Sequence, residues 1–126
     1  MNMETETIEQ NPEPALYGRL FGIVQYRHQL KALCESFATL GAGEIEVLDG
    51  LSGIAQLEKW KVDVSQYLFG DMEGEMLQRY LDAVKNNFIV FAAPVESEMA
   101  NSAAELAKTS GASEVTHFGN SMITNY

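Results

Sequence analysis

Cysteine, basic residues and long apolar runs are all scarce in this sequence. Cys34 is the only cysteine, so no disulfide can form within the chain and nothing requires an oxidising compartment. The longest apolar run, around Phe88, spans about eight residues, whereas a membrane-spanning helix needs about 20. The N-terminus lacks the basic start and apolar run of a signal peptide. We therefore expect a cytoplasmic protein that does not bind membranes.

The scarcity of Lys and Arg also limits the kinds of molecule that the protein is expected to bind. The chain has 8 basic and 18 acidic residues, for a net charge of −10. Nucleic-acid binding needs clustered Lys and Arg that displace the counterions of phosphates. We therefore expect no nucleic-acid partner, whereas a basic protein partner stays compatible with this charge.

The length of 126 residues suits one domain. Residues 1–14 contain four acids, no bases and two prolines, a composition that cannot bury enough apolar surface to stay ordered. We predict a flexible acidic arm over 1–14, with a docking tail for a basic partner as the alternative. Residues 15–126 are predicted to form the single domain.

The first half of the domain alternates strand and helix. Residues 17–26 are rich in β-branched and aromatic types, which predicts a strand. An amphipathic helix follows, whose apolar stripe comprises Leu30, Leu33, Cys34 and Phe37. Cys34 is therefore predicted to be a buried, inert thiol. Residues 44–48 alternate charged and apolar side chains, which predicts a strand with one wet face.

The middle of the chain favours helices. Residues 51–60 predict a short helix that packs Leu51, Ile54, Leu57 and Trp60, while residues 62–70 fit no single element. A second helix is predicted from Asp71, which suits an N-cap. Its apolar side chains repeat every four residues: Met72, Met76, Tyr80 and Val84.

The last third repeats the alternation. FIVFAAP, residues 88–94, predicts a strand that is apolar on both faces. A helix with an alanine stripe follows, with Ser97 as its expected N-cap, and residues 114–118 predict a final strand. This order predicts an α+β fold, namely a ferredoxin-like β-α-β-β-α-β sandwich with a helical insertion between strands 2 and 3.

One layer of helices would leave the second face of such a sheet bare. The side chains expected on that face or at its rim are Phe21, Ile23, Phe88, Val90 and Phe118. A large exposed apolar patch usually marks an interface. Either residues 51–86 fold over the sheet, or a second chain packs on it. We expect a homo-oligomer or a protein partner that uses these five residues.

Four stretches carry a resemblance to a known family. They are LFGIVQYRHQLKAL, GEIEVL, VDVSQYLFGDMEGEMLQRYLDAV leading into FIVFAA, and GASEVTHFG. Together they resemble the small bacterial heat-induced stress-protein domain, also called a general stress protein, over residues 17–119. Asn86 and Asn87 stand where such domains often have glycines, and the arm and the tail after the last strand are this chain's own. The resemblance implies a stress-linked ferredoxin-like domain without established catalysis, and it transfers no site residues.

The residues suggest no catalytic, cofactor or metal site. GAGE, residues 41–44, lacks the Lys of a phosphate loop, and the acids Asp71, Glu73 and Glu75 fit a solvated helix start better than a calcium loop. His28 is expected to be exposed. His117 is expected to make a structural hydrogen bond, with a haem ligand or a pH-sensitive group as alternatives.

Trp60 is expected to be a half-buried anchor, with a ligand-stacking platform as the alternative, and the methionines are expected to fill the core.

Three functions remain open. The first is a noncatalytic, stress-associated domain that acts through self-association or a protein partner. The second is a regulatory domain that binds a small-molecule effector at a subunit interface. The third is an enzyme of the dimeric α/β-barrel kind, haem-dependent through His117.

Overall fold

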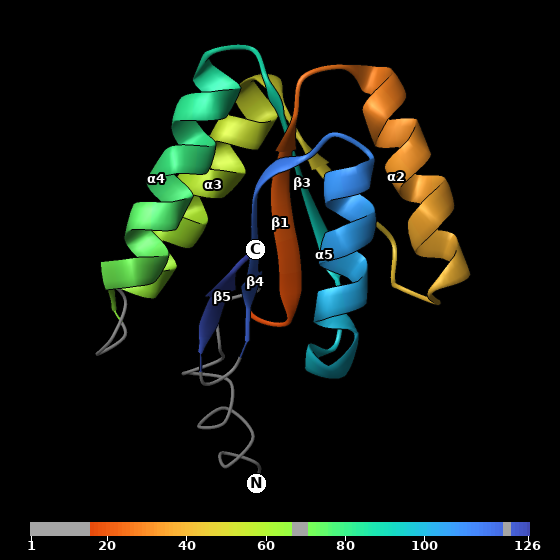
Figure 1. Ribbon diagram of the computed structural model, residues 1–126. Coiled ribbons are helices and arrows are strands. Elements are labelled where there is room, and N and C mark those ends of the chain that lie inside the picture. Colours follow the sequence, from red (N-terminus) through yellow and green to blue (C-terminus); the bar gives the residue numbers. More distant parts are fainter. Residues whose placement is uncertain (1–15, 67–70, 120–121) are drawn as a thin grey trace, which may run out of the picture.

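A five-stranded antiparallel sheet lies at the centre of the fold, between two pairs of helices (Figure 1). The computed structural model describes residues 16–66, 71–119 and 122–126, so the arm predicted over 1–14 lies outside the described residues. The strand order is β2-β3-β1-β4-β5, and neighbouring strands all pair antiparallel. The strands are β1 (Arg19–Val24), β2 (Glu46–Leu48), β3 (Ile89–Pro94), β4 (Ser113–Phe118) and β5 (Ile123–Asn125).

Two helices cover each face of the sheet. One face carries α2 (Arg27–Thr39) and α5 (Ala100–Thr109), the latter preceded by the 3-10 turn η1 (Ser97–Met99). The other face carries α3 (Gly50–Ser65) and α4 (Asp71–Lys85), which lie side by side (Figure 1). Residues 62–65, whose pattern was ambiguous, continue α3. Gln66 is the C-cap of α3, and residues 67–70 lie outside the described part of the chain.

The face under α2 and α5 is built as the periodicity predicts. Leu20 and Val24 of β1 and Phe91 of β3 pack against Leu33 and Phe37 of α2. The alanine stripe of α5 is buried, which lets this helix lie close to the sheet. Cys34 does not belong to this cluster, because its side chain is exposed and faces away from the sheet. The prediction of a buried thiol was therefore wrong.

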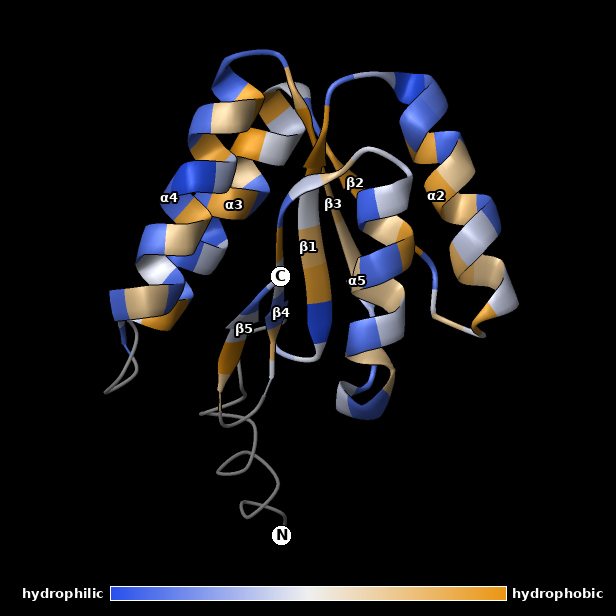
Figure 2. Cartoon of the chain, in the orientation of Figure 1, coloured by the Kyte–Doolittle hydropathy of each residue, from blue (hydrophilic) through white to orange (hydrophobic). Residues whose placement is uncertain are grey.

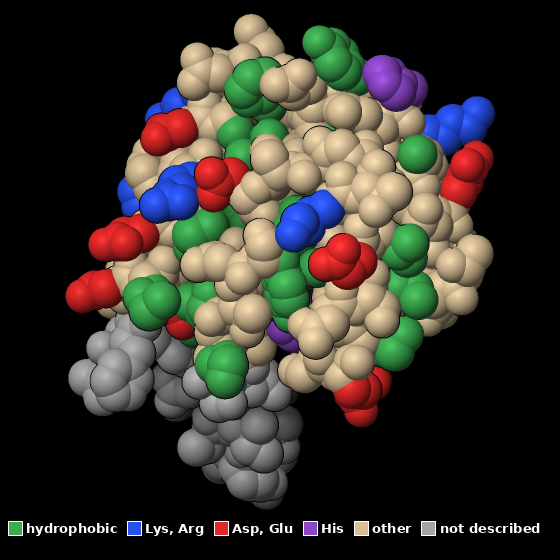
Figure 3. Space-filling model, in the orientation of Figure 1, with side chains coloured by type: hydrophobic (Ala, Val, Ile, Leu, Met, Phe, Trp, Pro, Cys, Tyr) green, Lys and Arg blue, Asp and Glu red, His purple; other side chains and the backbone are tan. Residues whose placement is uncertain are grey.

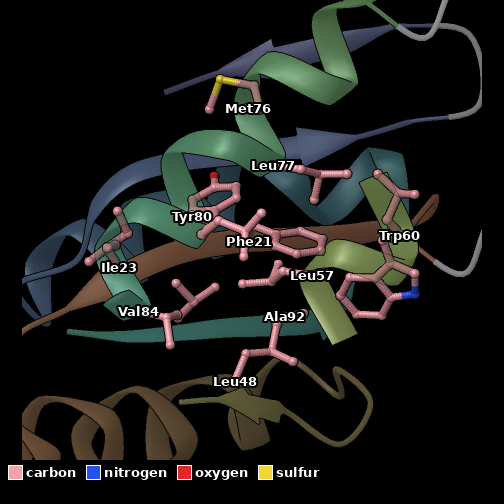
Figure 4. Packing of buried hydrophobic residues seen from close by; sticks show 14 of the residues in the cluster. Phe21, Ile23, Leu48, Leu57, Trp60, Met76, Leu77, Tyr80, Val84 and Ala92 are labelled. Carbon is pink, nitrogen blue, oxygen red and sulfur yellow. The ribbon is translucent and has the colours of Figure 1, made fainter. Parts of the chain in front are cut away.

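The second face is covered by α3 and α4 of the same chain. Leu57 and Trp60 of α3, and Leu77 and Tyr80 of α4, pack on Phe21 of β1 in one buried cluster (Figure 4). Of the two covers that the sequence left open, the helices of the chain's own middle, α3 and α4, lie on this face. Both helices turn their apolar sides to the sheet and their polar sides outward (Figure 2).

Several side chains of these two helices differ from expectation. Leu51 is 86% exposed and Met72 is 58% exposed, so neither belongs to the core stripe. Trp60 is more buried than expected, with only 3% of its surface exposed. The Arg19 guanidinium lies 5.6 Å from the centre of the Trp60 ring, and the Phe21 and Trp60 rings pack in a T-shaped arrangement. With so little of its surface exposed, Trp60 does not offer a platform on which a ligand could stack.

The tail after β4 forms a fifth strand. β5 pairs with β4, with Thr124 opposite His117 and Ile123 opposite Phe118. The backbone N–H of Tyr126 donates to the carbonyl oxygen of Val115 at 2.8 Å. The tail therefore extends the sheet at the edge beside β4, an element that the sequence pattern did not predict.

Candidate functional site

The five residues predicted to form an interface do not share one surface. Phe21, Val90 and Phe118 are fully buried and Ile23 is 9% exposed, all beneath α3 and α4. Phe88 lies just before β3 and is 37% exposed. Four of the five are thus packed within their own chain, and the side chain of Phe88 alone among them reaches the surface.

A hollow lies at the end of the sheet where β1 begins. We call it the end cleft. It has a volume of about 580 Å³ and is lined by Gly18, residues 40–43, residues 94–99 and Gly119. Gly18 precedes β1 and residues 40–43 precede β2. Residues 94–99 begin at the last residue of β3, and Gly119 follows β4. Four separate turns therefore converge on this hollow.

Backbone hydrogen bonds hold these turns together. The N–H of Gly18 donates to the carbonyl of Phe118 at 2.7 Å, and the N–H of Val95 donates to the carbonyl of Gly18 at 3.0 Å. The N–H of Gly43 donates to the carbonyl of Pro94 at 3.3 Å. A side chain on Gly43 would place its Cβ 2.9 Å from Cγ of Pro94. The close approach of these two turns therefore needs glycine.

A smaller hollow adjoins the end cleft, since both are lined by Ser97 and Gly119. We call it the inner hollow. It has a volume of about 280 Å³, and its other lining residues are Ala100, His117, Met122, Thr124 and Tyr126. Part of this wall comes from β5 and the residues around it, so the unpredicted strand helps to build the site.

His117 is one of four polar side chains that line the inner hollow, together with Ser97, Thr124 and Tyr126. It is only 4% exposed, and its Nε2 lies 2.7 Å from the carbonyl oxygen of Val95. Because a carbonyl oxygen can only accept, Nε2 carries the proton, and Nδ1 of the neutral ring is then an acceptor. This bond confirms the structural role predicted for His117.

The second nitrogen of His117 faces the hollow. A Cβ added to Gly119 would lie 3.7 Å from Nδ1, which places this atom on the side of Gly119 that lines both hollows. Among the described residues, the buried side-chain polar atom without a hydrogen-bond partner is Oε1 of Glu73, and Nδ1 of His117 is not such an atom.

The charges around the end cleft have one sign. Glu96 and Glu98 line it and are exposed, and neither hollow has a Lys or Arg among its described lining residues. Acidic and basic side chains are interspersed on the face that carries α4 and α5, without a continuous basic patch (Figure 3). The cleft therefore suits a neutral or cationic ligand better than an anionic one.

A different surface feature lies at the opposite end of the sheet. Tyr26 follows β1, Phe88 precedes β3 and Leu51 begins α3, so all three lie at the end where β1 finishes. They are 57%, 37% and 86% exposed, respectively. We call these three residues the apolar end. His28 is exposed there as expected, and its ring stacks on Tyr26 at 5.5 Å.

Two further polar groups lie inside the cover of the second face. The hydroxyl of Tyr80 donates to the carbonyl oxygen of Glu114 at 2.6 Å, and burial raises the pKa of Tyr80 well above its usual value of 10.0. Glu73, which was expected on a solvated helix start, is instead 8% exposed. Its Oε2 accepts from the Tyr17 hydroxyl at 2.8 Å, at the N-terminal turn of α4 where a carboxylate is favoured.

The described residues contain no group of three or more His, Cys, Asp or Glu side chains placed to hold a metal ion. Within the same part of the chain, no helix is both long and apolar enough to cross a membrane. Comparison with protein-family models, curated proteins and solved structures gives no match. The resemblance to the heat-induced stress-protein domain therefore stays a prediction.

Sequence reasoning singled out two parts of this site. Residues 41–44 were noted as a glycine-containing loop without the Lys of a phosphate loop, and His117 was expected to make a structural hydrogen bond. Sequence reasoning missed residues 94–99 and Gly119. The available signals were Pro94, the last residue of β3, and Gly119, which follows β4; both strands end beside the start of β1.

Proposed function

We propose that this protein is a noncatalytic domain that binds a small molecule in the end cleft. The observation that carries the proposal is the convergence of four turns on a hollow of about 580 Å³, a size typical of ligand sites. The described hydrogen bonds pair no nucleophile with a base, since His117 bonds a backbone carbonyl instead. This proposal corresponds to the effector-binding alternative.

The topology supports a ferredoxin-like assignment. The four strands in the order β2-β3-β1-β4, with α2 and α5 as the connecting helices on one face, match a β-α-β-β-α-β sandwich. In this assignment α3 and α4 are the helical insertion between strands 2 and 3, and β5 is an addition at the edge. The end cleft then lies outside the sheet, where the turns are free to vary without disturbing the core.

A matched pair of variants tests the site. Ser97 lines both hollows, and both Ser97 and Ser102 are exposed. Two-dimensional amide spectra of the protein would be screened against nucleotides, amino acids and amines. We expect at least one compound to shift the resonances of residues 40–43 and 94–99, to lose this effect in Ser97→Phe, and to keep it in Ser102→Phe. A flat screen, or equal binding to Ser97→Phe, would overturn the proposal.

Self-association is the second candidate, and the apolar end is the observation that favours it. Tyr26, Leu51 and Phe88 are exposed at one end of the sheet, and exposed apolar side chains of this kind are ones that a second copy of the chain could cover. Light scattering over a wide concentration range tests this. A dimer in the parent and a monomer in the Leu51→Ser variant would support it, whereas a monomer throughout would exclude it. The link to stress, which the resemblance implies, stays a prediction.

A further inference from the structure

We propose that the outer edge of β5 is an interface at which two copies of this chain pair, β5 against β5, around a twofold axis at Thr124. This surface is separate from the end cleft, so the inference does not depend on the proposed function. β5 is the last strand in the order β2-β3-β1-β4-β5 and lies at the margin of the sheet (Figure 1). One side of β5 therefore has no neighbouring strand within the described sheet, and such an edge is a template for pairing with another chain.

The hydrogen bonds between β5 and β4 show which backbone groups point away from the sheet. The N–H of Tyr126 donates to the carbonyl of Val115, and the carbonyl of Met122 accepts from the N–H of Gly119. In an antiparallel pair, hydrogen-bonded residues alternate along the strand with residues that point the other way. The even-numbered residues of 122–126 therefore direct their backbone groups at β4.

The two residues between them, Ile123 and Asn125, direct their N–H and carbonyl groups outward. A twofold axis at Thr124 places Ile123 of one copy opposite Asn125 of the other. Each such pair exchanges two hydrogen bonds, so two copies together satisfy every outward group of both strands. This edge is thus complementary to itself, as a twofold interface requires, and for this reason the occupant is a second copy of the chain.

The side chains at this edge fit the same axis. Met122 and Tyr126 line the inner hollow together with Ala100 of α5, so both lie on the face that carries α5. In the paired strands, Met122 of one copy lies opposite Tyr126 of the other, and methionine sulfur packs favourably on aromatic rings. This contact occurs twice and covers Met122, which is 66% exposed in the single chain. Thr124 lies opposite its own copy, and cross-strand threonine pairs are favourable.

Charge distinguishes β5 from β2, the strand at the other edge of the sheet. Glu44, Glu46 and Asp49 lie in or beside β2, and charged side chains are a common means of preventing edge pairing. By contrast, residues 122–126 contain no charged side chain. Two chains that each carry a net charge of −10 can therefore meet along β5 without repulsion between the side chains of the paired strands.

Cross-linking at the axis tests the register of the pair. Two residues on this axis form a non-hydrogen-bonded pair, whose Cα atoms lie about 4.5 Å apart, within the range of a disulfide. In a Cys34→Ser background, Thr124→Cys should form a covalent dimer under mild oxidation about tenfold or more faster than Ser102→Cys, because pairing raises the local thiol concentration. Ser102 is the matched control because it is exposed on α5. Equal rates would overturn the proposal.

Sedimentation equilibrium of the full chain measures the association itself. We expect the parent to be in a monomer–dimer equilibrium. Thr124→Lys should weaken the dimer about tenfold or more, because it places two like charges opposite each other on the axis. The control is Leu51→Ser, which alters the apolar end and should leave this dimer intact. A parent that is monomeric at every concentration, or a dimer that persists in Thr124→Lys, would overturn the proposal.

Hydrogen exchange of the parent gives a measurement that needs no variant. The N–H groups of Ile123 and Asn125 should become about tenfold or more protected as the protein concentration rises through the dimer transition. The N–H of Thr124 faces β4 and should be protected at all concentrations. Protection of Ile123 and Asn125 that does not depend on concentration would show that no second copy pairs with this edge, and the inference would fail.

Discussion

The ring of Phe21 is stacked on the ring of Tyr80, with centroids 5.3 Å apart and 23° between the ring planes. Phe21 belongs to the central strand β1, and Tyr80 belongs to α4, within the segment that connects β2 to β3. The Phe118 ring also packs on Phe21, at 5.1 Å. The connecting segment is therefore part of the core, and the aromatic cluster joins it to the sheet (Figure 4).

The first prediction concerns Phe21→Ala. Because Phe21 is fully buried between β1, α3 and α4, its truncation should lower the free energy of unfolding by about 3–5 kcal/mol. Urea denaturation measures this change. Phe88→Ala is the control, because Phe88 is 37% exposed and should cost about 1 kcal/mol or less.

The Phe21→Ala variant also tests whether Phe21 packs within one chain or against a second chain. If Phe21 lies within one chain, Phe21→Ala should leave the mass measured by light scattering unchanged while it destabilises the fold. A drop from dimer to monomer with little loss of stability would instead show that this sheet face binds a second chain.

The second prediction concerns the ionisation of Tyr80. Burial raises the pKa of Tyr80 above its usual value of 10.0, so the folded protein keeps a proton that the unfolded chain releases. The stabilisation from this group is complete below about pH 10 and declines as the pH rises beyond it. The difference in unfolding free energy between the parent and Tyr80→Phe should therefore narrow as the pH rises above about 10.

At neutral pH the Tyr80→Phe variant measures how much the hydrogen bond of the Tyr80 hydroxyl contributes to the free energy of unfolding. Tyr80→Phe removes the donor to the carbonyl of Glu114, 2.6 Å away, and should cost about 1–3 kcal/mol. Spectrophotometric titration provides the check on ionisation. One tyrosine fewer should ionise in the folded parent than in the unfolded chain over the same alkaline range, and full ionisation without unfolding would contradict the prediction.

The sequence was enough to predict which way most strand residues point. Phe21 and Ile23 were expected to share the face that α2 and α5 do not cover, and both lie in the cluster beneath α3 and α4. The sequence could not decide which face of residues 88–94 meets which helices, because both faces are apolar. The sequence also could not show which element covers the second face of the sheet. An apolar stripe shows that one side of a helix is packed, but it does not identify the element against which that side packs.

The site was harder to predict than the fold. Its lining comes from four turns and a short edge strand, and such segments have no hydrophobic period. Gly41 and Gly43 could be recognised in the sequence as loop residues. Pro94, whose carbonyl accepts from the N–H of Gly43, lies 51 positions further along the chain, and the pairing of β2 with β3 brings it close to Gly43. Convergence of this kind follows from strand order, which local patterns do not specify.

The third prediction concerns Gly22 in the middle of β1. A Cβ at this position would lie 2.5 Å from Cε2 of Phe91, and the Phe91 ring is itself packed edge-on against Phe37. Gly22→Ala should therefore destabilise the protein by about 1–3 kcal/mol through overpacking. Gly74→Ala is the control, because a Cβ there meets nothing within 4 Å and should stabilise α4 by about 0.5–1 kcal/mol.

A second substitution tests the cause. Phe91→Leu removes the ring atoms that the new methyl group would meet, so the double variant should be less destabilised than the sum of the two single variants. Strict additivity would mean that the cost of Gly22→Ala arises from something other than this contact.

The fourth prediction follows from the exposure of Cys34. Its side chain lies on the outer side of α2, so a thiol reagent such as dithionitrobenzoate should reach it without unfolding. We expect one thiol per chain to react in the native protein, at a rate within about tenfold of that in the urea-unfolded chain, because access rather than opening then limits the reaction. Cys34→Ser should abolish the reaction and change the unfolding free energy by about 0.5 kcal/mol or less. A thiol that reacts only after urea is added would contradict this prediction and would show that Cys34 is buried, as its place in the apolar stripe had predicted. The helix α2 would then have to be rotated about its axis relative to the sheet.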